Sequence, residues 1–159
     1  MKITVIVCTH NPRKDYFERT LEGLSCQTLS QDLWELIVVD NNSNPPVELH
    51  EAERFPKLRV VQESEAGLTL ARIRGVSESI GDLLVFVDDD NVLQTDYLEV
   101  GLRLAERHPC LGAWGGSSPG EFEVQVPDIM AKHLEYIGVR EVTKAQWGNV
   151  LTGDLPKPI

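Results

Sequence analysis

The stretch Leu83-Leu84-Val85-Phe86-Val87-Asp88-Asp89-Asp90-Asn91 is the part of the chain from which the fold is predicted. Its apolar run lies between Gly81-Asp82 and a group of acids, which is the pattern of a strand buried on both faces of a parallel sheet. Three carboxylates follow, where this strand leaves the core. If the extended geometry persists, Asp88 and Asp90 project to one side and Asp89 to the other, because side chains alternate along a strand.

Carboxylates so close together repel each other unless a cation lies between them. Two like charges about 5 Å apart cost roughly 1 kcal/mol in water, and several times more in a partly dry cleft. Mg²⁺ or Mn²⁺ turns this repulsion into attraction, because both ions prefer carboxylate oxygens and commonly bridge them to phosphate. The alternative is a solvated acidic turn. Helix capping fits poorly, since Thr95 is the expected N-cap of a helix over Asp96–Arg107.

The composition argues against several classes of protein. The chain has 159 residues, the size of one domain, and its net charge of −10 speaks against a nucleic-acid partner, which would require a basic stripe. No apolar run approaches the roughly 20 residues of a transmembrane segment, and the start resembles no signal peptide. Cys8, Cys26 and Cys110 lack metal-ligand spacing, so buried, reduced thiols are expected. A cytoplasmic protein is predicted, with peripheral attachment to the inner face of a membrane left open.

Apolar periodicity predicts that strands and helices alternate along the chain. Strands are predicted at Ile3–Cys8, Leu36–Val39, Leu58–Gln62 and Leu83–Val87, with shorter ones at Leu111–Trp114 and Glu121–Val126. Helices are predicted at Asp15–Cys26, Val47–Arg54, Gly67–Ile80, Asp96–Arg107 and Pro127–Tyr136, with Gly81 as a left-handed cap. This order predicts an α/β fold with a mostly parallel, Rossmann-like sheet covered by helices on both faces.

Polar side chains follow three of the predicted strands: Thr9-His10-Asn11, Asp40-Asn41-Asn42 and Asp88-Asp89-Asp90. The carboxyl ends of parallel strands share one edge of a sheet, so these groups are expected to meet in one crevice, which suits a nucleotide diphosphate. Each group also has a simpler interpretation. Asp40 can start an Asx-turn, and Arg72 and Arg74 can be solvated helix charges.

Four segments together resemble family 2 glycosyltransferases with the GT-A fold. They are Val5-Ile6-Val7-Cys8-Thr9-His10-Asn11-Pro12, Leu36-Ile37-Val38-Val39-Asp40-Asn41-Asn42-Ser43, Gly67 followed by Ala71-Arg72-Ile73-Arg74-Gly75, and Val85-Phe86-Val87-Asp88-Asp89-Asp90. They occur in the order and rough spacing of that family, over about the first 115 residues. The order of the motifs carries the resemblance, because an Asp triplet alone is a weak signal.

The resemblance implies an inverting, metal-dependent hexosyltransferase that uses a nucleotide-diphospho-sugar donor, a UDP-sugar being favoured, and an unknown acceptor. The roles that it implies are nucleotide contacts for Thr9 and Asn11, a hydrogen bond from Asp40 to the base, phosphate contact for Arg72, and metal coordination by Asp90 and Asp88, with Asp88 or Asp89 near the ribose and a metal-bound water. The cofactor is then Mn²⁺ or Mg²⁺, which stabilises the leaving diphosphate.

The chain departs from the family pattern in two ways. Ile73 replaces the usual Asn after Arg72, and the general base of the family is expected beyond Ile159. Residues 1–115 are therefore predicted to be a donor-binding core, and 116–159 the truncated start of an acceptor-side segment, so that the GT-A sheet is incomplete at the C-terminus. Such a piece is expected to bind donor but to turn over poorly, and apolar surface left exposed could support a homodimer.

Other classes of protein fit less well. A NAD-dependent dehydrogenase needs a glycine-rich turn after the first strand, and Thr9–Lys14 contains no glycine. A phosphotransferase with an aspartate nucleophile would carry its acids on the first strand. The main alternative is a nucleotide-sugar-binding module without catalytic activity.

Overall fold

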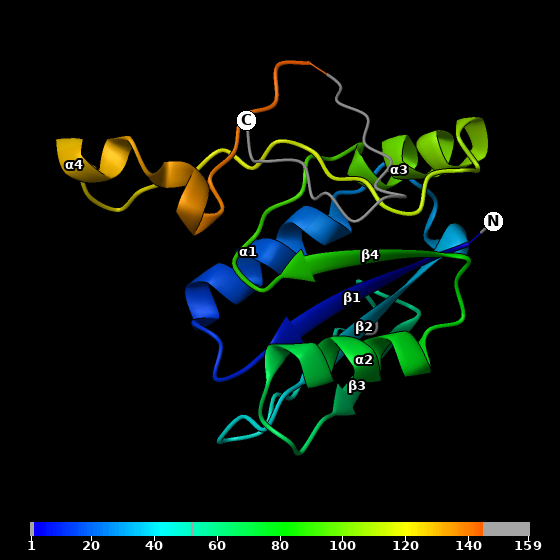
Figure 1. Cartoon of the computed structure of the whole chain (residues 1–159). Coiled ribbons are helices and arrows are strands. Elements are labelled where there is room, and N and C mark those ends of the chain that lie inside the picture. The colour runs from blue at the N-terminus through cyan, green and yellow to red at the C-terminus, as the bar shows by residue number, and fades with distance from the viewer. Residues whose placement is uncertain (1, 52, 145–159) are drawn as a thin grey trace. The chain divides into compact units, whose positions relative to one another are not determined.

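A sheet of four parallel strands lies at the centre of the first part of the chain (Figure 1). The computed structural model describes residues 2–51 and 53–144. The strands are β1 (Ile3–Thr9), β2 (Trp34–Asp40), β3 (Leu58–Gln62) and β4 (Leu83–Asp88), in the spatial order β3-β2-β1-β4. All three pairings are parallel, so every strand ends at the same edge of the sheet.

Helices cover both faces of this sheet, as predicted. One face packs against α1 (Lys14–Ser25) and α3 (Tyr97–Arg107), and the other against α2 (Leu68–Glu78) (Figure 1). The side chains of β1 and β2 supply both cores because neighbouring residues of a strand point to opposite faces. Val5 and Leu36 belong to the larger core on the α1 side, whereas Ile6, Ile37, Val39 and Ala71 form the smaller core beneath α2.

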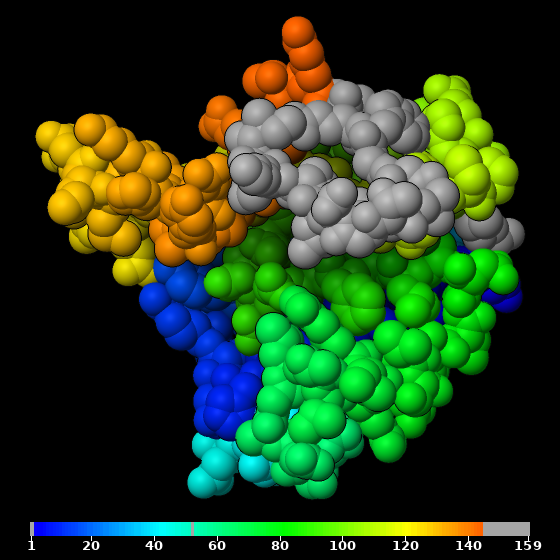
Figure 2. Space-filling view, in the orientation of Figure 1, coloured from blue at the N-terminus to red at the C-terminus, as the bar shows by residue number. Residues whose placement is uncertain are grey.

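The four main strands lie within two residues of their predicted positions, but β4 is not buried on both faces. Phe86 is 46% exposed, and Val87 is the one residue of β4 in the buried class. The prediction is wrong because β4 is an edge strand of the described sheet and α2 packs over β1 and β2. Figure 2 shows α2 and β4, both green, on the surface of this unit.

The predicted alternation of the three acids is also absent. The strand ends at Asp88, and Asp89 and Asp90 lie in a turn that is closed by a hydrogen bond from the Asn91 N–H to the Asp88 carbonyl (3.1 Å). A turn replaces the extended backbone that strict alternation requires.

Two glycines allow close packing on β1, one within α2 and one in the segment that follows it. A Cβ at Gly75 would collide with the side chain of Ile6, so glycine allows α2 to pack directly on β1. Gly81 was predicted as a left-handed cap, but α2 ends at Glu78 with Ser79 as its C-cap, and Gly81 is not among the residues with positive φ. Its role is close approach, since a Cβ there would lie 2.6 Å from the Thr4 nitrogen.

Thr95 was predicted to cap the start of α3, but a side chain from a distant part of the chain does so instead. Asp96 occupies the N-cap position without a side-chain cap bond. The Gln27 side chain, just beyond α1, accepts a hydrogen bond from the Leu98 N–H (3.0 Å) and donates one to the Gln94 carbonyl (2.8 Å). A free helix N–H was satisfied by tertiary contact, which local sequence does not encode.

Other predicted elements are absent or shorter. The helix predicted at Val47–Arg54 does not form among the described residues of that range. A 3₁₀ turn that was not predicted, η1 (Gln31–Leu33), precedes β2. The thiols are free, as expected, but Cys26 and Cys110 are exposed rather than buried. Within the described ranges, each helix is too short or too polar to cross a bilayer.

A second compact unit begins after Cys110. Its described part, residues 111–144, contains α4 (Asp128–Ala131), the 3₁₀ helix η2 (Leu134–Ile137) and an isolated bridge between Ser118 and Arg140. The strands predicted at Leu111–Trp114 and Glu121–Val126 are not formed, and the helix predicted at Pro127–Tyr136 is split into two pieces. Residues 145–159, part of the predicted acceptor-side segment, lie outside the described residues.

Candidate functional site

The predicted site residues of three strands meet at the carboxyl edge of the sheet. In the register of the strands Thr9 pairs with Asp40, and Cys8 pairs with Asp88. Residues 31 and 80 positions apart in the sequence are therefore neighbours across adjacent strands, as the parallel order requires. The crevice at a strand-end edge is where open α/β sheets bind ligands.

Asp40 lies below the surface of this edge and holds the loop that follows β2. The residue is 2% exposed, and its carboxylate accepts two hydrogen bonds, Oδ1 from the Ser43 N–H and Oδ2 from the Val47 N–H, both at 3.0 Å. Burial raises the pKa of this carboxyl, but the hydrogen bonds from Ser43 and Val47 outweigh burial and hold the pKa below its ordinary value. The ionised Asp40 thus shapes the loop 41–47, and direct contact with a base stays a prediction.

The loop after β1 is joined to this loop by a chain of hydrogen bonds. Asn11, whose φ is +49°, donates through its N–H to Ser43 Oγ and accepts from the Asn44 N–H through Oδ1, both at 2.8 Å. His10 Nδ1 lies 2.7 Å from the Asn41 carbonyl. Since a carbonyl only accepts, Nδ1 carries the hydrogen, and Nε2 can accept from Asn11 Nδ2 at 2.9 Å.

The acids after β4 differ in what they contact. The Thr9 hydroxyl donates to Asp89 Oδ2. Asp88 Oδ1 lies 3.3 Å from a guanidinium nitrogen of Arg72, which also stands over the ring of Phe86 at 5.9 Å. Asp90 is exposed and makes no hydrogen bond or ion pair with any described residue.

The carboxylate oxygens of Asp88, Asp89 and Asp90 are ligands that a hard cation prefers, but protein side chains alone do not complete a metal site here. Among the described residues, no group of three or more His, Cys, Asp or Glu side chains converges to hold a metal ion. Mg²⁺ in proteins is usually held by one or two carboxylates, with phosphate oxygens and water completing its shell. A cation at Asp88 and Asp90 would need oxygens from a phosphorylated ligand and from water, and coordination by these two residues stays a prediction.

Cys8 is half-buried and is the register partner of Asp88. Burial raises the pKa of its thiol to about 11, against a lowering effect of the Arg72 charge and with small further rises from Asp88 and Asp89. A thiol with this pKa stays protonated, whereas nucleophilic attack requires the thiolate.

Sequence reasoning placed Asn41 at this edge but assigned it no role. Its side chain is 5% exposed and bonds to the connection between β3 and α2. An Asn directly after a strand is also a common turn former, so the sequence contains no signal that separates the two roles.

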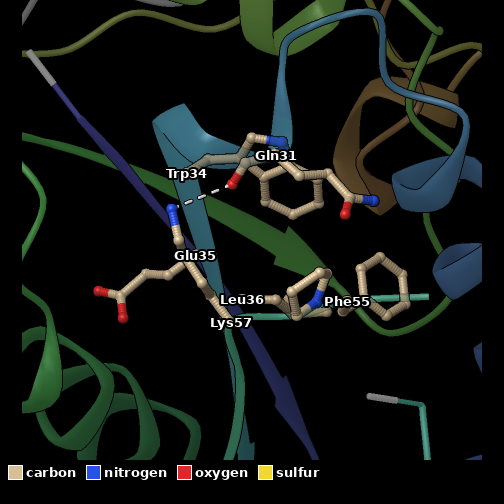
Figure 3. Close-up of a pocket in the computed structure, with 7 residues that line it drawn as sticks. Gln31, Trp34, Glu35, Leu36, Phe55 and Lys57 are labelled. Carbon is tan, nitrogen blue, oxygen red and sulfur yellow. Dashed lines mark hydrogen bonds between the residues drawn. The ribbon is translucent and has the colours of Figure 1, made fainter. Parts of the chain in front are cut away.

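A small pocket elsewhere in this unit is separate from the predicted site (Figure 3). It lies at the amino end of β2, beside Trp34 and Phe55. The rings of these two residues meet edge to face, with their centroids 6.1 Å apart. Lys57 Nζ donates a hydrogen bond to the Gln31 carbonyl at the same place (3.3 Å). None of its lining residues is a predicted site residue. The chemistry of the molecule is expected at the opposite end of the strand.

An open parallel sheet with polar loops at its carboxyl edge is typical of the α/β proteins that bind nucleotides. Comparison with known proteins shows which family of α/β proteins the chain belongs to. The model of Glycosyl transferase family 2 matches residues 4–151, and the chain belongs to that family.

Curated relatives include several transferases. The chain is 28% identical over 148 residues to the glucosyl-dolichyl phosphate glucuronosyltransferase of Haloferax volcanii, covering 86% of this chain and 42% of the relative. It is 32% identical over 136 residues to the uncharacterized glycosyltransferase YibD of Escherichia coli, covering 79% and 38% respectively. The chain thus spans about two fifths of the length of these relatives.

Solved structures share the fold. TarS 1–349 of S. aureus in complex with UDP matches with a TM-score of 0.67 and 23% identity, over 82% of this chain and 39% of that one. The mannosyltransferase PcManGT of Pyrobaculum calidifontis, solved with GDP-Man and Mn²⁺, matches with a TM-score of 0.57 and 24% identity, over 76% and 36%. The predicted GT-A type α/β fold is confirmed.

Proposed function

We propose that this chain forms the donor site of an inverting, metal-dependent glycosyltransferase of the hexosyltransferase type, which uses a nucleotide-diphospho-sugar. The observation that carries the proposal is the gathering of Thr9, Asp88 and Arg72 at one edge of the sheet, next to the loop held by Asp40. A hydroxyl, acids and one arginine in a single crevice match the parts of a nucleotide diphosphate: ribose hydroxyls, phosphates and their counter-ion.

The charge of this edge supports a requirement for metal. Three acids follow β4, and among the described residues Asp88 forms an ion pair with Arg72, whereas Arg74 is paired with Glu78 at 3.0 Å. A diphosphate brought to this edge without a cation would meet net negative charge. A divalent ion bound by Asp90 and Asp88 would offset that charge, and when bound it would stabilise the leaving diphosphate.

The remaining roles follow from position. Thr9 and Asn11 would line the nucleotide pocket, and Asp40 would support the base, directly or through the loop that it shapes. Arg72 would turn from Asp88 towards the phosphates, an exchange made easier because the pair is partly exposed, with side chains 43% and 57% accessible. Asp89, held by Thr9, would lie near the ribose.

The donor is proposed to be a UDP-sugar. Support comes from TarS, which has been solved in complex with UDP and with UDP-GlcNAc. PcManGT, in contrast, was solved with GDP-Man. The base preference of this chain is therefore a direct question for experiment.

Titration calorimetry of the full chain with UDP, GDP and ADP, each with and without Mn²⁺, tests the proposal. We expect UDP to bind most tightly and Mn²⁺ to strengthen its binding. Nucleotide binding that does not depend on metal, or no binding at all, would contradict the proposal. Donor hydrolysis and transfer assays then separate an enzyme from a binding module.

A further inference from the structure

The side chain of Asn41 is buried at the carboxyl edge and makes three hydrogen bonds to one loop. Its Nδ2 donates to the carbonyls of Glu63 (3.2 Å) and Glu65 (2.7 Å), and its Oδ1 accepts from the Gly67 N–H (2.7 Å). Carbonyls only accept and an N–H only donates, so only a carboxamide in this orientation satisfies all three partners.

The backbone of the same residue is bonded to the loop after β1. The Asn41 N–H donates to the Thr9 carbonyl at 2.8 Å, and the Asn41 carbonyl accepts from His10 Nδ1 at 2.7 Å. Asn41 therefore connects the end of β1 with the connection between β3 and α2, although these segments are more than 50 residues apart. The Glu63 N–H also donates to the Asp40 carbonyl at 2.9 Å, so the Asn41 side chain extends to Glu65 and Gly67 a connection that the backbone begins.

This connection determines where α2 begins. Gly67 is the N-cap of α2, with a φ of +155° that favours glycine. Arg72 lies in the second turn of the helix, 3.3 Å from Asp88. Since a short helix is rigid, the position of its first residue sets how far the guanidinium of Arg72 reaches over the edge of the sheet.

We propose that Asn41 is a positioning residue, which fixes the distance between the loops that receive the nucleoside and the arginine that receives the diphosphate. The inference rests on the proposed donor site. Asn41 is buried and its carboxamide is fully used within the protein, so it acts on the ligand through Arg72 and not by contact. Its effect should therefore appear in the affinity that the second phosphate adds.

The test compares UMP with UDP, both with Mn²⁺, by calorimetry on the full chain. Asn41→Asp replaces the donating NH₂ with an oxygen that faces two carbonyls, and so displaces the start of α2. We expect the ratio of UDP to UMP affinity to fall about tenfold, which corresponds to one lost charge-assisted hydrogen bond. The affinity for UMP should change little.

Gln62→Glu is the matched control. Gln62 is the last residue of β3 and the register partner of Asp40, and its exposed side chain would undergo the same amide-to-acid change at the neighbouring strand end. This variant should keep the ratio of the wild-type chain. An equal fall in the control would assign the effect to charge alone and overturn the proposal.

A thermal melt accompanies each titration. If Asn41→Asp is unfolded at the assay temperature, Asn41→Ser, which adds no charge, is measured in its place. In an Arg72→Ala background the Asn41 variant should no longer change the ratio. An unchanged ratio in a folded variant, or equal loss for UMP and UDP, would overturn the positioning role alone, whereas a wild-type chain that binds neither nucleotide would overturn the donor site as well.

Discussion

Single side chains differ at this edge in whether the fold already uses them. Asp40 is saturated by two loop amides, Asp89 accepts from Thr9, and Asp88 is paired with Arg72. Asp90 is exposed and bonds to no described residue. Of the two acids that the family resemblance marks as metal ligands, Asp90 is thus the one that the fold does not already use.

Asp90→Ala should remove the metal-dependent part of nucleotide binding. We expect the strengthening of UDP binding by Mn²⁺ to fall at least about tenfold, since losing even an outer-shell partner of a metal ligand typically costs roughly that much. Calorimetry with and without Mn²⁺ measures it. Asp32→Ala is the control, because Asp32 lies in η1, before β2, and its side chain is 95% exposed. Unchanged metal dependence in Asp90→Ala would show that Asp90 is not a ligand.

At the scale of elements, the packing of helices on the sheet depends on particular small residues. Gly75 and Gly101 both lie inside helices, but their surroundings differ. A Cβ at Gly75 would collide with Ile6, whereas a Cβ at Gly101 would meet no heavy atom of the described residues within 4 Å apart from its chain neighbours and the backbone of its own helix. Helix propensity treats the two glycines alike, so only tertiary contact separates them.

Gly75→Ala should destabilise the chain by about 1–3 kcal/mol, because α2 must move away from β1 to admit the methyl group. Gly101→Ala should leave stability unchanged or raise it by about 0.5–1 kcal/mol, as alanine favours a helix over glycine. Urea unfolding of both variants beside the wild-type chain measures the difference. Equal effects at the two positions would contradict the close packing of α2.

A buried carboxylate ties three strands and the segment after α2 together at the amino edge of the sheet. Glu35 on β2 is 7% exposed and accepts from Thr4 Oγ1 (2.7 Å), the Ile80 N–H (3.0 Å) and Arg59 (3.2 Å). Burial raises the pKa of this carboxyl, but the bonds from Thr4, Ile80 and Arg59 outweigh burial and lower the pKa below its ordinary value. Glu35 therefore stabilises the fold in its ionised form.

The stability that Glu35 contributes is expected to depend on pH. A lowered pKa means that the contribution is present above the unfolded value, about 4.5, and is lost as pH falls through the folded value. Glu35→Gln should cost about 1–3 kcal/mol at pH 7, and this difference from wild type should shrink below pH 4.5. The pKa of Asp40 is also lowered, but Asp40 is present in both the wild-type chain and Glu35→Gln. The difference in free energy of unfolding between these two chains, measured with urea at several pH values, therefore reports on Glu35. A difference that is constant or grows towards acid pH would contradict this account.

At the scale of the whole chain, the candidate site and the rest of the sequence belong to different units. Every predicted site residue from Thr9 to Asp90 lies in the unit that ends at Cys110. That unit has its own sheet and cores on both faces, as an independently folding domain requires. The predicted boundary at residue 115 stays a prediction.

Residues 1–110 alone should therefore fold and bind UDP with Mn²⁺ within about twofold of the full chain, since every predicted site residue lies in this unit. Circular dichroism checks folding, and calorimetry measures affinity against the full chain. If the shorter chain folds but binds much more weakly, residues after Cys110 contribute to the donor site.

The sequence by itself determined the order of elements and the edge at which chemistry gathers. Periodicity of apolar residues located β1 to β4 and the three long helices, and parallel strands then placed Thr9, Asp40 and Asp88 together without any further information. Predictions failed where periodicity was weak, as in Val47–Arg54 and in residues 111–136. In such segments backbone groups form hydrogen bonds with side chains from other parts of the chain, as the Val47 N–H does with Asp40, and no local pattern specifies these bonds.

Only the tertiary structure decided which of the gathered groups are already committed. The bonds of Thr9 to Asp89, of Gln27 to Leu98 and of Asn41 to Gly67 join residues 80, 71 and 26 positions apart. Exposure of Phe86 likewise depends on where α2 packs and not on the apolar run that contains it. The physical reason is that residue type and spacing set which hydrogen bonds a side chain can make and whether it can be buried. Its actual partner depends on which groups the folded chain brings within about 3 Å.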